Sequence, residues 1–240
     1  MNPPIHNSQF TIRNSPVLAL LFDFGGTLDA DGVAWKERFF RLCREEGVAV
    51  SPDRFDAAFY AADDALVGAV PSSLGLRATV ERLARGLAEA LEISDPAMPR
   101  RLAERFHSEA SARLADSVRL LERLAPRYRL GVVSNFYGNL AGVCAETGIG
   151  RSLGVAVDSA AVGFRKPDPR IFHEALKALG AQPAEAVFVG DSVPRDMAGA
   201  REIGMRHVWL KAPDSNGAAQ PCCPGDPVIR RLAELEEIVP

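Results

Sequence analysis

Short runs of apolar residues recur along the chain in the pattern that is typical of buried parallel strands. The first two are VLALLFDF at 17–24 and RLGVVSNF at 129–136. Further runs follow at 154–160, 186–192 and 206–212. Several of them are near-continuous stretches of Val, Leu and Phe, as expected when helices cover both faces of a parallel sheet. The pattern therefore predicts strands at these positions.

Helix patterns with clear start and stop signals separate the later runs. In DPRIFHEALKALG, Asp168 can cap the first turn and Gly180 can end the helix, and the apolar residues between them form one stripe. The sequence VPRDMAGAREIG repeats this design between Pro194 and Gly204. Alternation of strands and helices predicts an α/β fold with a doubly wound, Rossmann-like parallel sheet.

Residues 33–113 interrupt this alternation, because they contain four helix patterns and no good strand candidate. Such an all-helical block, inserted after the first strand, predicts a helical cap domain. Near the end of the chain, 213–226 is expected to be a loop, and PVIRRLAELEEIV is expected to be an amphipathic helix. The predicted parts are a flexible tail at 1–15, an α/β core at 16–32 and 114–240, and the cap at 33–113.

Composition and charge exclude several classes of partner. The 240 residues carry a formal net charge of −3, so neither nucleic acid nor an anionic membrane surface is expected to bind. No apolar run reaches the roughly 20 residues of a membrane span, and the start of the chain has no signal-peptide pattern. The four cysteines have neither metal-type nor secreted disulfide spacing, which favours a reducing, cytoplasmic setting.

Polar residues stand where several of the predicted strands end. Asp23 follows the first apolar run, Ser134 ends the second, and Asp191 follows the fourth. Because ligands of open α/β sheets bind beyond the carboxyl ends of the strands, we expect these side chains to converge. Each alone could be a turn or cap residue, but their joint placement favours a functional site.

Four motifs, in order, resemble those of the haloacid dehalogenase-like hydrolases. They are FDFGGTL around Asp23, VVSN ending in Ser134 and Asn135, GFRKPDPRIF around Lys166, and VFVGDSVPRDMAGAREIGM with Asp191 and Asp196. The resemblance covers about residues 17–212, and the long fourth motif is its most specific part. The helical insert between the first two motifs is similar to the α-helical cap of this family.

The resemblance implies a magnesium-dependent hydrolase that acts on a small phosphomonoester, so a small phosphorylated metabolite is the expected partner. In this family an aspartate attacks phosphorus and forms an aspartyl-phosphate. The implied catalytic residues are Asp23, Lys166 and Ser134. The implied phosphate-binding residues are Thr27, Ser134, Asn135 and Lys166. The implied magnesium ligands are Asp23, Asp191, Asp196 and the backbone carbonyl of Gly25. Three aspartates against Mg²⁺ and one lysine leave such a site near neutral before the substrate arrives.

The first motif departs from the family pattern at Gly25, where phosphatases of the family usually carry a second aspartate. That aspartate protonates the leaving alkoxide and then activates water. General acid–base catalysis of this kind is typically worth about 10²–10⁴ in rate. Asp29, Asp31 or a residue of the cap could replace it, which would make this a phosphatase with atypical acid–base chemistry.

Three other hypotheses remain. Family 2-haloacid dehalogenases also attack through an aspartate, but they have a tyrosine in the first motif and lack the acidic pair of the fourth. Phosphonate carbon–phosphorus hydrolases also lack the second aspartate, but they use a cap lysine. The only lysine of this cap is Lys36, whose surroundings do not match. The last alternative is a catalytically weak or silent member with a binding or regulatory role.

Overall fold

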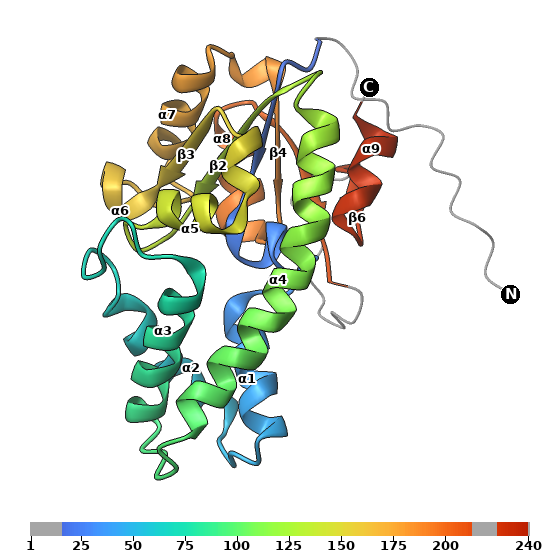
Figure 1. The fold of residues 1–240 in the computed structure, drawn as a ribbon. Helices are drawn as coiled ribbons and strands as arrows, with labels where there is room; N and C mark the ends of the chain where they lie inside the picture. Colours follow the sequence, from blue (N-terminus) through green and yellow to red (C-terminus); the bar gives the residue numbers. More distant parts are fainter. Residues whose placement is uncertain (1–15, 213–224, 240) are drawn as a thin grey trace, which may run out of the picture.

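The computed structural model describes residues 16–212 and 225–239, and within them six parallel strands form one sheet (Figure 1). The predicted tail at 1–15 and most of the predicted loop at 213–226 lie outside the described residues. The strand order is β3-β2-β1-β4-β5-β6, a doubly wound order that confirms the predicted fold class. The strands are β1 (Ala19–Phe22), β2 (Arg129–Ser134), β3 (Val155–Asp158), β4 (Ala186–Gly190), β5 (Arg206–Leu210) and β6 (Val228–Ile229).

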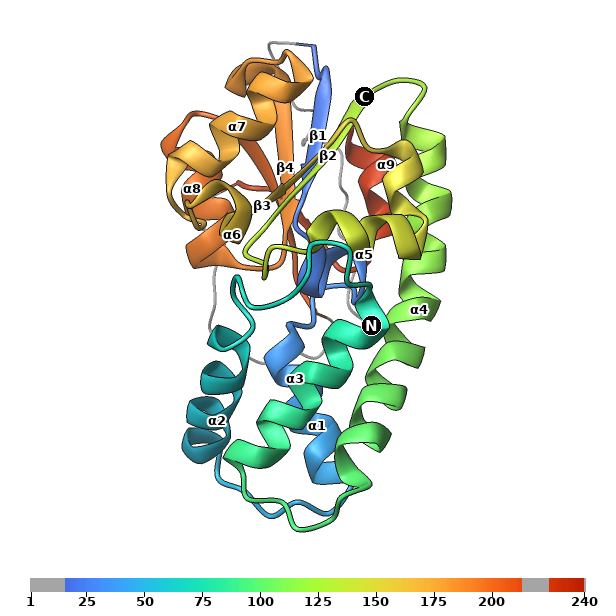
Figure 2. The ribbon, with the colours of Figure 1, turned by 60° about the vertical axis from the view of Figure 1, so that its left-hand side comes forward.

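Helices cover both faces of the sheet and form a separate layer beyond one end of it (Figures 1 and 2). None of the helices in the described part of the chain is long and apolar enough to cross a membrane. The helices are α1 (Trp35–Glu45), α2 (Pro52–Asp64), α3 (Leu76–Ala90), α4 (Met98–Leu124), α5 (Leu140–Thr147), α6 (Ser159–Val162), α7 (Pro169–Leu179), α8 (Ala198–Glu202) and α9 (Leu235–Ile238).

Burial on both faces explains why the strands are apolar throughout. All four residues of β1 are buried, and alternate residues point to opposite faces. Leu20 belongs to an apolar cluster with Leu121 of α4, whereas Leu21 belongs to a second cluster with Phe172 of α7. A strand between two such clusters has no polar face, and the continuous runs in the sequence follow from this.

The helices α1, α2 and α3 pack with the first half of α4 beyond the carboxyl ends of the strands (Figure 2). Aromatic rings join them: Phe39 of α1 stacks on Phe106 of α4 with 4.6 Å between ring centroids. The helix α4 has 27 residues and continues upward beside the sheet, so the predicted boundary at residue 113 lies within it. The division into a core and a cap domain stays a prediction.

The C-terminal segment corrects one expectation, because PVIRRLAELEEIV is not a single amphipathic helix. It begins as β6, which pairs in parallel with β5, and only its last residues form a 3₁₀ turn and the short helix α9. The N–H of Trp209 donates to the carbonyl of Pro227 at 3.0 Å, and that of Lys211 to Ile229 at 2.9 Å. Hydrogen bonds offered by the edge of β5 thus outweigh the helical pattern of the sequence.

Candidate active site

Asp23 lies where β1 ends, at the side of the sheet that faces the helical layer. Its N–H still belongs to the sheet and donates to the carbonyl of Val189 at 2.9 Å. Its side chain is buried, and Oδ1 accepts a hydrogen bond from Ser134 Oγ at 2.8 Å. The same oxygen lies 2.7 Å from Lys166 Nζ. The structure therefore brings the three predicted catalytic residues together from three distant parts of the sequence.

Lys166 is fully buried and joins two carboxylates, since its Nζ lies 2.7 Å from Asp23 Oδ1 and 2.7 Å from Asp196 Oδ1. Burial alone would favour the neutral amine, but the adjacent carboxylates of Asp196 and Asp23 outweigh it and raise the pKa of Lys166. Asn135 holds this lysine through the backbone: its Oδ1 accepts from the Lys166 N–H at 2.7 Å, and its Nδ2 donates to the Lys166 carbonyl at 3.1 Å.

Three carboxylates converge at this point, because oxygens of Asp23, Asp191 and Asp196 all lie within 4.8 Å of one another. Burial raises the pKa of Asp191 well above its usual range, and the negative charges of Asp23 and Asp196 add to this effect. Burial also raises the pKa of Asp196, although Lys166 opposes the shift. Lys166 contacts two of these three acids, so the carboxylates outnumber their cationic partners among the described residues.

Neighbouring side chains and backbone groups orient the acids of the cluster. Thr27 Oγ1 donates to Asp191 Oδ1 at 3.1 Å, and the indole of Trp209 donates to the backbone carbonyl of Asp191 at 3.0 Å. Asp196 accepts from the N–H of Ser192 at 3.0 Å. Thr27, a predicted phosphate-binding residue, is therefore in direct contact with the acidic cluster.

The second glycine of the FDFGGTL motif is required by its conformation and by its neighbour. Gly26 has φ of +92°, and a Cβ atom there would lie 2.6 Å from Asp191 Oδ2. Both observations exclude an ordinary side chain at this position. This close approach places the turn after Asp23, which includes Gly25, beside the acidic cluster.

The donor set suits a hard divalent cation. All three side chains offer oxygen atoms, which Mg²⁺ prefers, and their mutual repulsion is relieved when a cation binds. Lys166 alone cannot balance them. The residues present therefore fit the magnesium site that the sequence predicts.

Asp29, one of the acids considered as a replacement for the missing aspartate, is completely buried in a cluster of its own. Its Oδ1 accepts from the N–H of Gly26 at 2.7 Å. Its Oδ2 accepts from Trp35 Nε1 at 2.8 Å and forms an ion pair with Arg38 NH1 at 2.7 Å. Burial raises the pKa of Asp29, and the guanidinium of Arg38 is the main opposing influence. These donors belong to the turn after Asp23 and to α1. Asp29 therefore holds the turn and the start of α1 together.

Asp31, the other acid considered, points away from Asp23 and toward the C-terminal segment. Its Oδ1 accepts from the N–H of Leu232 at 3.1 Å, and its Oδ2 lies 3.2 Å from Arg113 NH1. Its φ of +40° is unusual for a residue other than glycine. Asp31 therefore ties the loop before α1 to α4 and to the end of the chain.

Sequence reasoning missed Trp35 and Arg38, which lie at the start of α1 and reach back to Asp29. Both look like ordinary residues of an amphipathic helix. The available signal was Gly25 itself: where a side chain is missing beside a buried turn, another residue must fill the volume. Nothing in the sequence indicates which residue does so.

Comparison with known proteins now identifies the class of enzyme. A sequence profile of the haloacid dehalogenase-like hydrolases matches residues 17–204. The chain therefore belongs to this family and is a hydrolase. The bovine haloacid dehalogenase-like hydrolase domain-containing protein 3 is 36% identical over 112 residues, which are 47% of this chain and 41% of the bovine protein. The match thus spans about two fifths of the length of that relative.

Solved structures of both phosphatases and dehalogenases resemble the fold. A HAD phosphatase from Thermococcus onnurineus is 25% identical with a TM-score of 0.56, and the match covers 92% of this chain and 97% of that one. A dehalogenase determined with an intermediate complex has a TM-score of 0.64 at 20% identity, covering 95% and 100% of the two chains. The second likeness shows the fold alone, so the residues of the site must distinguish the two chemistries.

Proposed function

We propose that this hydrolase is a magnesium-dependent phosphatase that acts on small phosphomonoesters through an aspartyl-phosphate on Asp23. The observation that carries the proposal is the position of the Asp23 carboxylate at the end of β1. One oxygen contacts Lys166 and Ser134, and the acidic pair Asp191 and Asp196 lies beside it. A carboxylate nucleophile that contacts a lysine and lies beside further carboxylates able to hold a metal ion suits a dianionic substrate.

The proposed metal ligands are Asp23, Asp191, Asp196 and the carbonyl of Gly25. When bound, Mg²⁺ neutralises charge on the phosphoryl oxygens, which allows a carboxylate to approach phosphorus. The cluster of three carboxylates supports this assignment, because a cation relieves the repulsion between them.

The remaining roles fall to side chains that already surround Asp23. Lys166, which is held in place by Asn135, offsets negative charge as the substrate binds. The hydroxyl groups of Ser134 and Thr27 can turn from their carboxylate partners toward phosphoryl oxygens. Asn135 is proposed as a phosphate ligand from the sequence, and its contacts to the Lys166 backbone give it a positioning role as well.

Two alternatives have less support from the side chains. A haloacid dehalogenase needs no cation, and three clustered carboxylates would then stand against its anionic substrate. A phosphonate hydrolase needs a free cap lysine, whereas Lys36 Nζ pairs with Asp56 at 2.7 Å and lies 3.4 Å from Glu37. The Thermococcus phosphatase likeness agrees with the phosphatase proposal.

A rapid-mixing experiment with p-nitrophenyl phosphate and Mg²⁺ tests the proposal. We expect an initial burst of nitrophenolate, because the first step releases it while Asp23 becomes phosphorylated. Asp23→Asn should abolish the burst and lower turnover by at least about 10³-fold. Asp116→Asn, on the exposed surface of α4, is the matched control and should keep both.

Four outcomes decide the matter. A magnesium-dependent burst that Asp23→Asn removes supports the nucleophile. A burst that persists in Asp23→Asn would overturn this assignment. Absence of both burst and turnover with Mg²⁺ would favour a binding role for the fold, and release of halide from 2-haloacids would favour the dehalogenase.

A further inference from the structure

The backbone at Gly25 suits any residue, but the space beside it is filled. With φ of −76° and ψ of 115°, Gly25 has an extended conformation that L-residues adopt freely. A Cβ atom at this position would lie 3.2 Å from Nε1 and 3.3 Å from Cδ1 of Trp35. The indole thus borders the place where a side chain two residues after Asp23 would begin.

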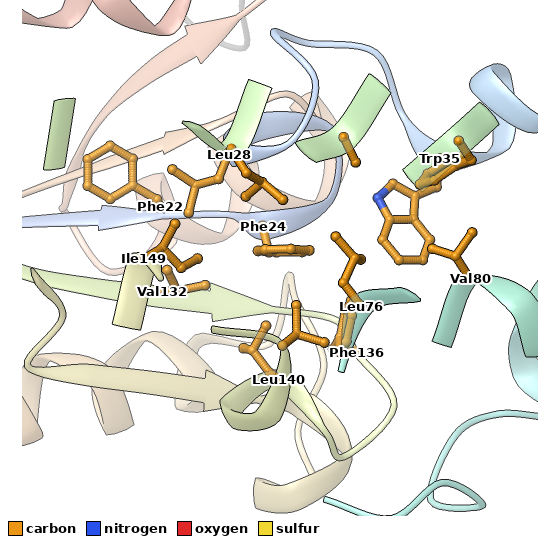
Figure 3. Close-up of a cluster of buried hydrophobic side chains, with 14 of the residues drawn as sticks. Phe22, Phe24, Leu28, Trp35, Leu76, Val80, Val132, Phe136, Leu140 and Ile149 are labelled. Atoms are coloured by element: carbon orange, nitrogen blue, oxygen red, sulfur yellow. The ribbon is translucent and has the colours of Figure 1, made fainter. Parts of the chain in front are cut away.

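Trp35 is fixed in that place by a hydrogen bond and by aromatic rings. Its Nε1 donates to Asp29 Oδ2 at 2.8 Å, and its ring lies edge-on to Phe106 at 5.0 Å and to Phe136 at 5.8 Å between centroids. Figure 3 shows the indole at the edge of this apolar cluster, on the side of Leu76, Val80 and Phe136. Only 8% of the residue is exposed, so the ring cannot move aside without disturbing this packing.

The acids that the sequence offers as replacements, and Asp63 of the helical layer, each contact other partners. Asp29 accepts hydrogen bonds from the Gly26 N–H, Trp35 and Arg38, and Asp31 contacts Leu232 and Arg113. At the end of α2, Asp63 accepts a hydrogen bond from the hydroxyl of Tyr137 at 2.5 Å. An indole therefore borders the position from which a carboxyl group two residues after Asp23 would extend.

We propose that Trp35 determines substrate class: the enzyme cleaves phosphoryl compounds whose leaving group departs as a stable anion, such as aryl or acyl phosphates, in preference to alkyl phosphates. This inference rests on the proposed phosphatase function. An aspartate at position 25 would protonate a departing alkoxide, which is a strong base. An indole N–H that already donates to Asp29 cannot do so, whereas an aryloxide or a carboxylate needs no proton as it leaves.

The two steps balance without an acid from the protein. An oxygen of Asp23 forms a bond to phosphorus as the bond from phosphorus to the leaving oxygen breaks, and the electron pair departs with that oxygen. Water then attacks the phosphorus of the aspartyl-phosphate, and the Asp23 carboxylate is released. One proton of this water stays on the phosphate product and the other goes to bulk solvent. The second step lacks a base, so we expect it to be slow.

A series of substrates tests the inference on the unmodified protein. The probes are acetyl phosphate, p-nitrophenyl phosphate, phenyl phosphate and glycerol 2-phosphate, each mixed rapidly with protein and Mg²⁺. We expect the rate of the first step to fall along the series and to be at least about 10²–10⁴-fold lower for the alkyl ester, which is the factor that a general acid typically supplies. The dependence of this rate on the pKa of the leaving group is the readout.

Variants of the two positions sharpen the test. In Gly25→Asp alone the new Cβ requires the indole to yield by a few tenths of an ångström, whereas Gly25→Asp combined with Trp35→Ala relieves this contact. We expect the double variant to cleave glycerol 2-phosphate at least about tenfold faster than Trp35→Ala alone, and its rates to depend less on the leaving group. Trp35→Phe keeps an aromatic ring at this place and should retain the steep series of the unmodified protein.

The result that overturns the inference differs from the one that overturns the proposed function. Similar rates for glycerol 2-phosphate and p-nitrophenyl phosphate, with the burst intact, would mean that another acid protonates the leaving group. Asp63→Asn, with its exposed neighbour Asp64→Asn as control, would then be tested first. No phosphorylation of Asp23 by any of the four compounds would remove the proposed function itself.

Discussion

Asp23 and Asp29 are six residues apart in the sequence, and each belongs to an acidic site. The two sites differ in how their negative charge is balanced. Asp29 is one carboxylate that faces one guanidinium, with hydrogen bonds from Trp35 and the Gly26 N–H completing its shell. The Asp23 cluster has three carboxylates, and among the described side chains Lys166 is the cation that contacts two of them. The carboxylate of the first site is matched by one cation, whereas the second site holds more carboxylates than cationic partners among the described residues.

The comparison distinguishes a buried charge that fixes the fold from a group of buried charges that is suited to binding. A buried ion pair with satisfied hydrogen bonds costs little once formed and fixes the geometry around it. A cluster with excess negative charge destabilises the folded state. Such clusters occur at functional sites, where binding of a ligand offsets this destabilisation. The sequence places Asp23 at the end of a strand, whereas the role of Asp29, which directly follows the FDFGGTL motif, is defined by its contacts with Arg38, Trp35 and Gly26 in the structure.

Removing the buried ion pair between Asp29 and Arg38 should have the largest effect on stability. Arg38→Met removes the guanidinium, which is almost fully buried, and leaves the Asp29 carboxylate without its counter-charge. We expect a loss of about 3–5 kcal/mol in the free energy of unfolding, which is the usual result of removing one partner of a buried pair. Urea denaturation measures the change.

Arg41→Met on the same helix is the control for this variant. Arg41 is partly exposed and pairs with Glu45 and Glu109, so its removal should cost no more than about 1 kcal/mol. Equal effects of the two variants would contradict the structural role given to the Asp29 site. In a double-mutant cycle, Asp29→Asn with Arg38→Met should lose less than the sum of the single variants.

The acidic cluster around Asp23 should respond to added Mg²⁺. At a concentration of 100 times its Kd, Mg²⁺ should stabilise the protein by about 2.7 kcal/mol, which corresponds to roughly 5–10 °C in Tm for a chain of this size. Asp191→Asn should remove most of this shift, whereas Asp116→Asn should keep it. Differential scanning calorimetry with and without Mg²⁺ gives the comparison. An unchanged shift in Asp191→Asn would show that Mg²⁺ binds elsewhere.

The smallest effect should be the dependence of metal-free stability on pH. Burial raises the pKa of Asp191 and of Asp196, so folding favours their protonated forms. An acid with a raised folded pKa is least costly below its unfolded pKa of about 4, and its stability contribution is lost as the pH rises toward the folded pKa. The Tm of the metal-free protein should therefore decline across this interval, and Asp191→Asn should flatten the decline. A rise of Tm with pH that Asp191→Asn leaves unaltered would contradict this account.

The doubly wound sheet and the residues at its strand ends could be predicted because both follow from local patterns. Continuous apolar runs preceded Asp23, Ser134 and Asp191, and a parallel sheet places the ends of its strands at one edge. The structure brings these residues together as expected. The family assignment is confirmed by the profile match, whereas the roles of individual residues remain proposals that the experiments above test.

The features that the sequence did not predict depend on contacts between distant elements. Trp35 faces Gly25 only because the turn after Asp23 and the start of α1 fold back on each other. At the end of the chain, residues with a helical pattern became β6 because β5 offered an edge. Tertiary contacts determine both features, and such contacts produce no periodic pattern in the sequence.

The length of α4 has a mechanical consequence. Its 27 residues form a rod of about 40 Å, and the hydroxyl of Ser117 anchors it to the carbonyl of Leu28 at 2.6 Å, close to the turn that carries Asp23. Rotation of the rod by about 10° around this anchor would swing its Met98 end through about 5 Å. The helical layer is thus attached to the longer arm of α4, so a small rotation of this helix about the Ser117–Leu28 contact moves the Met98 end farther than the Leu124 end.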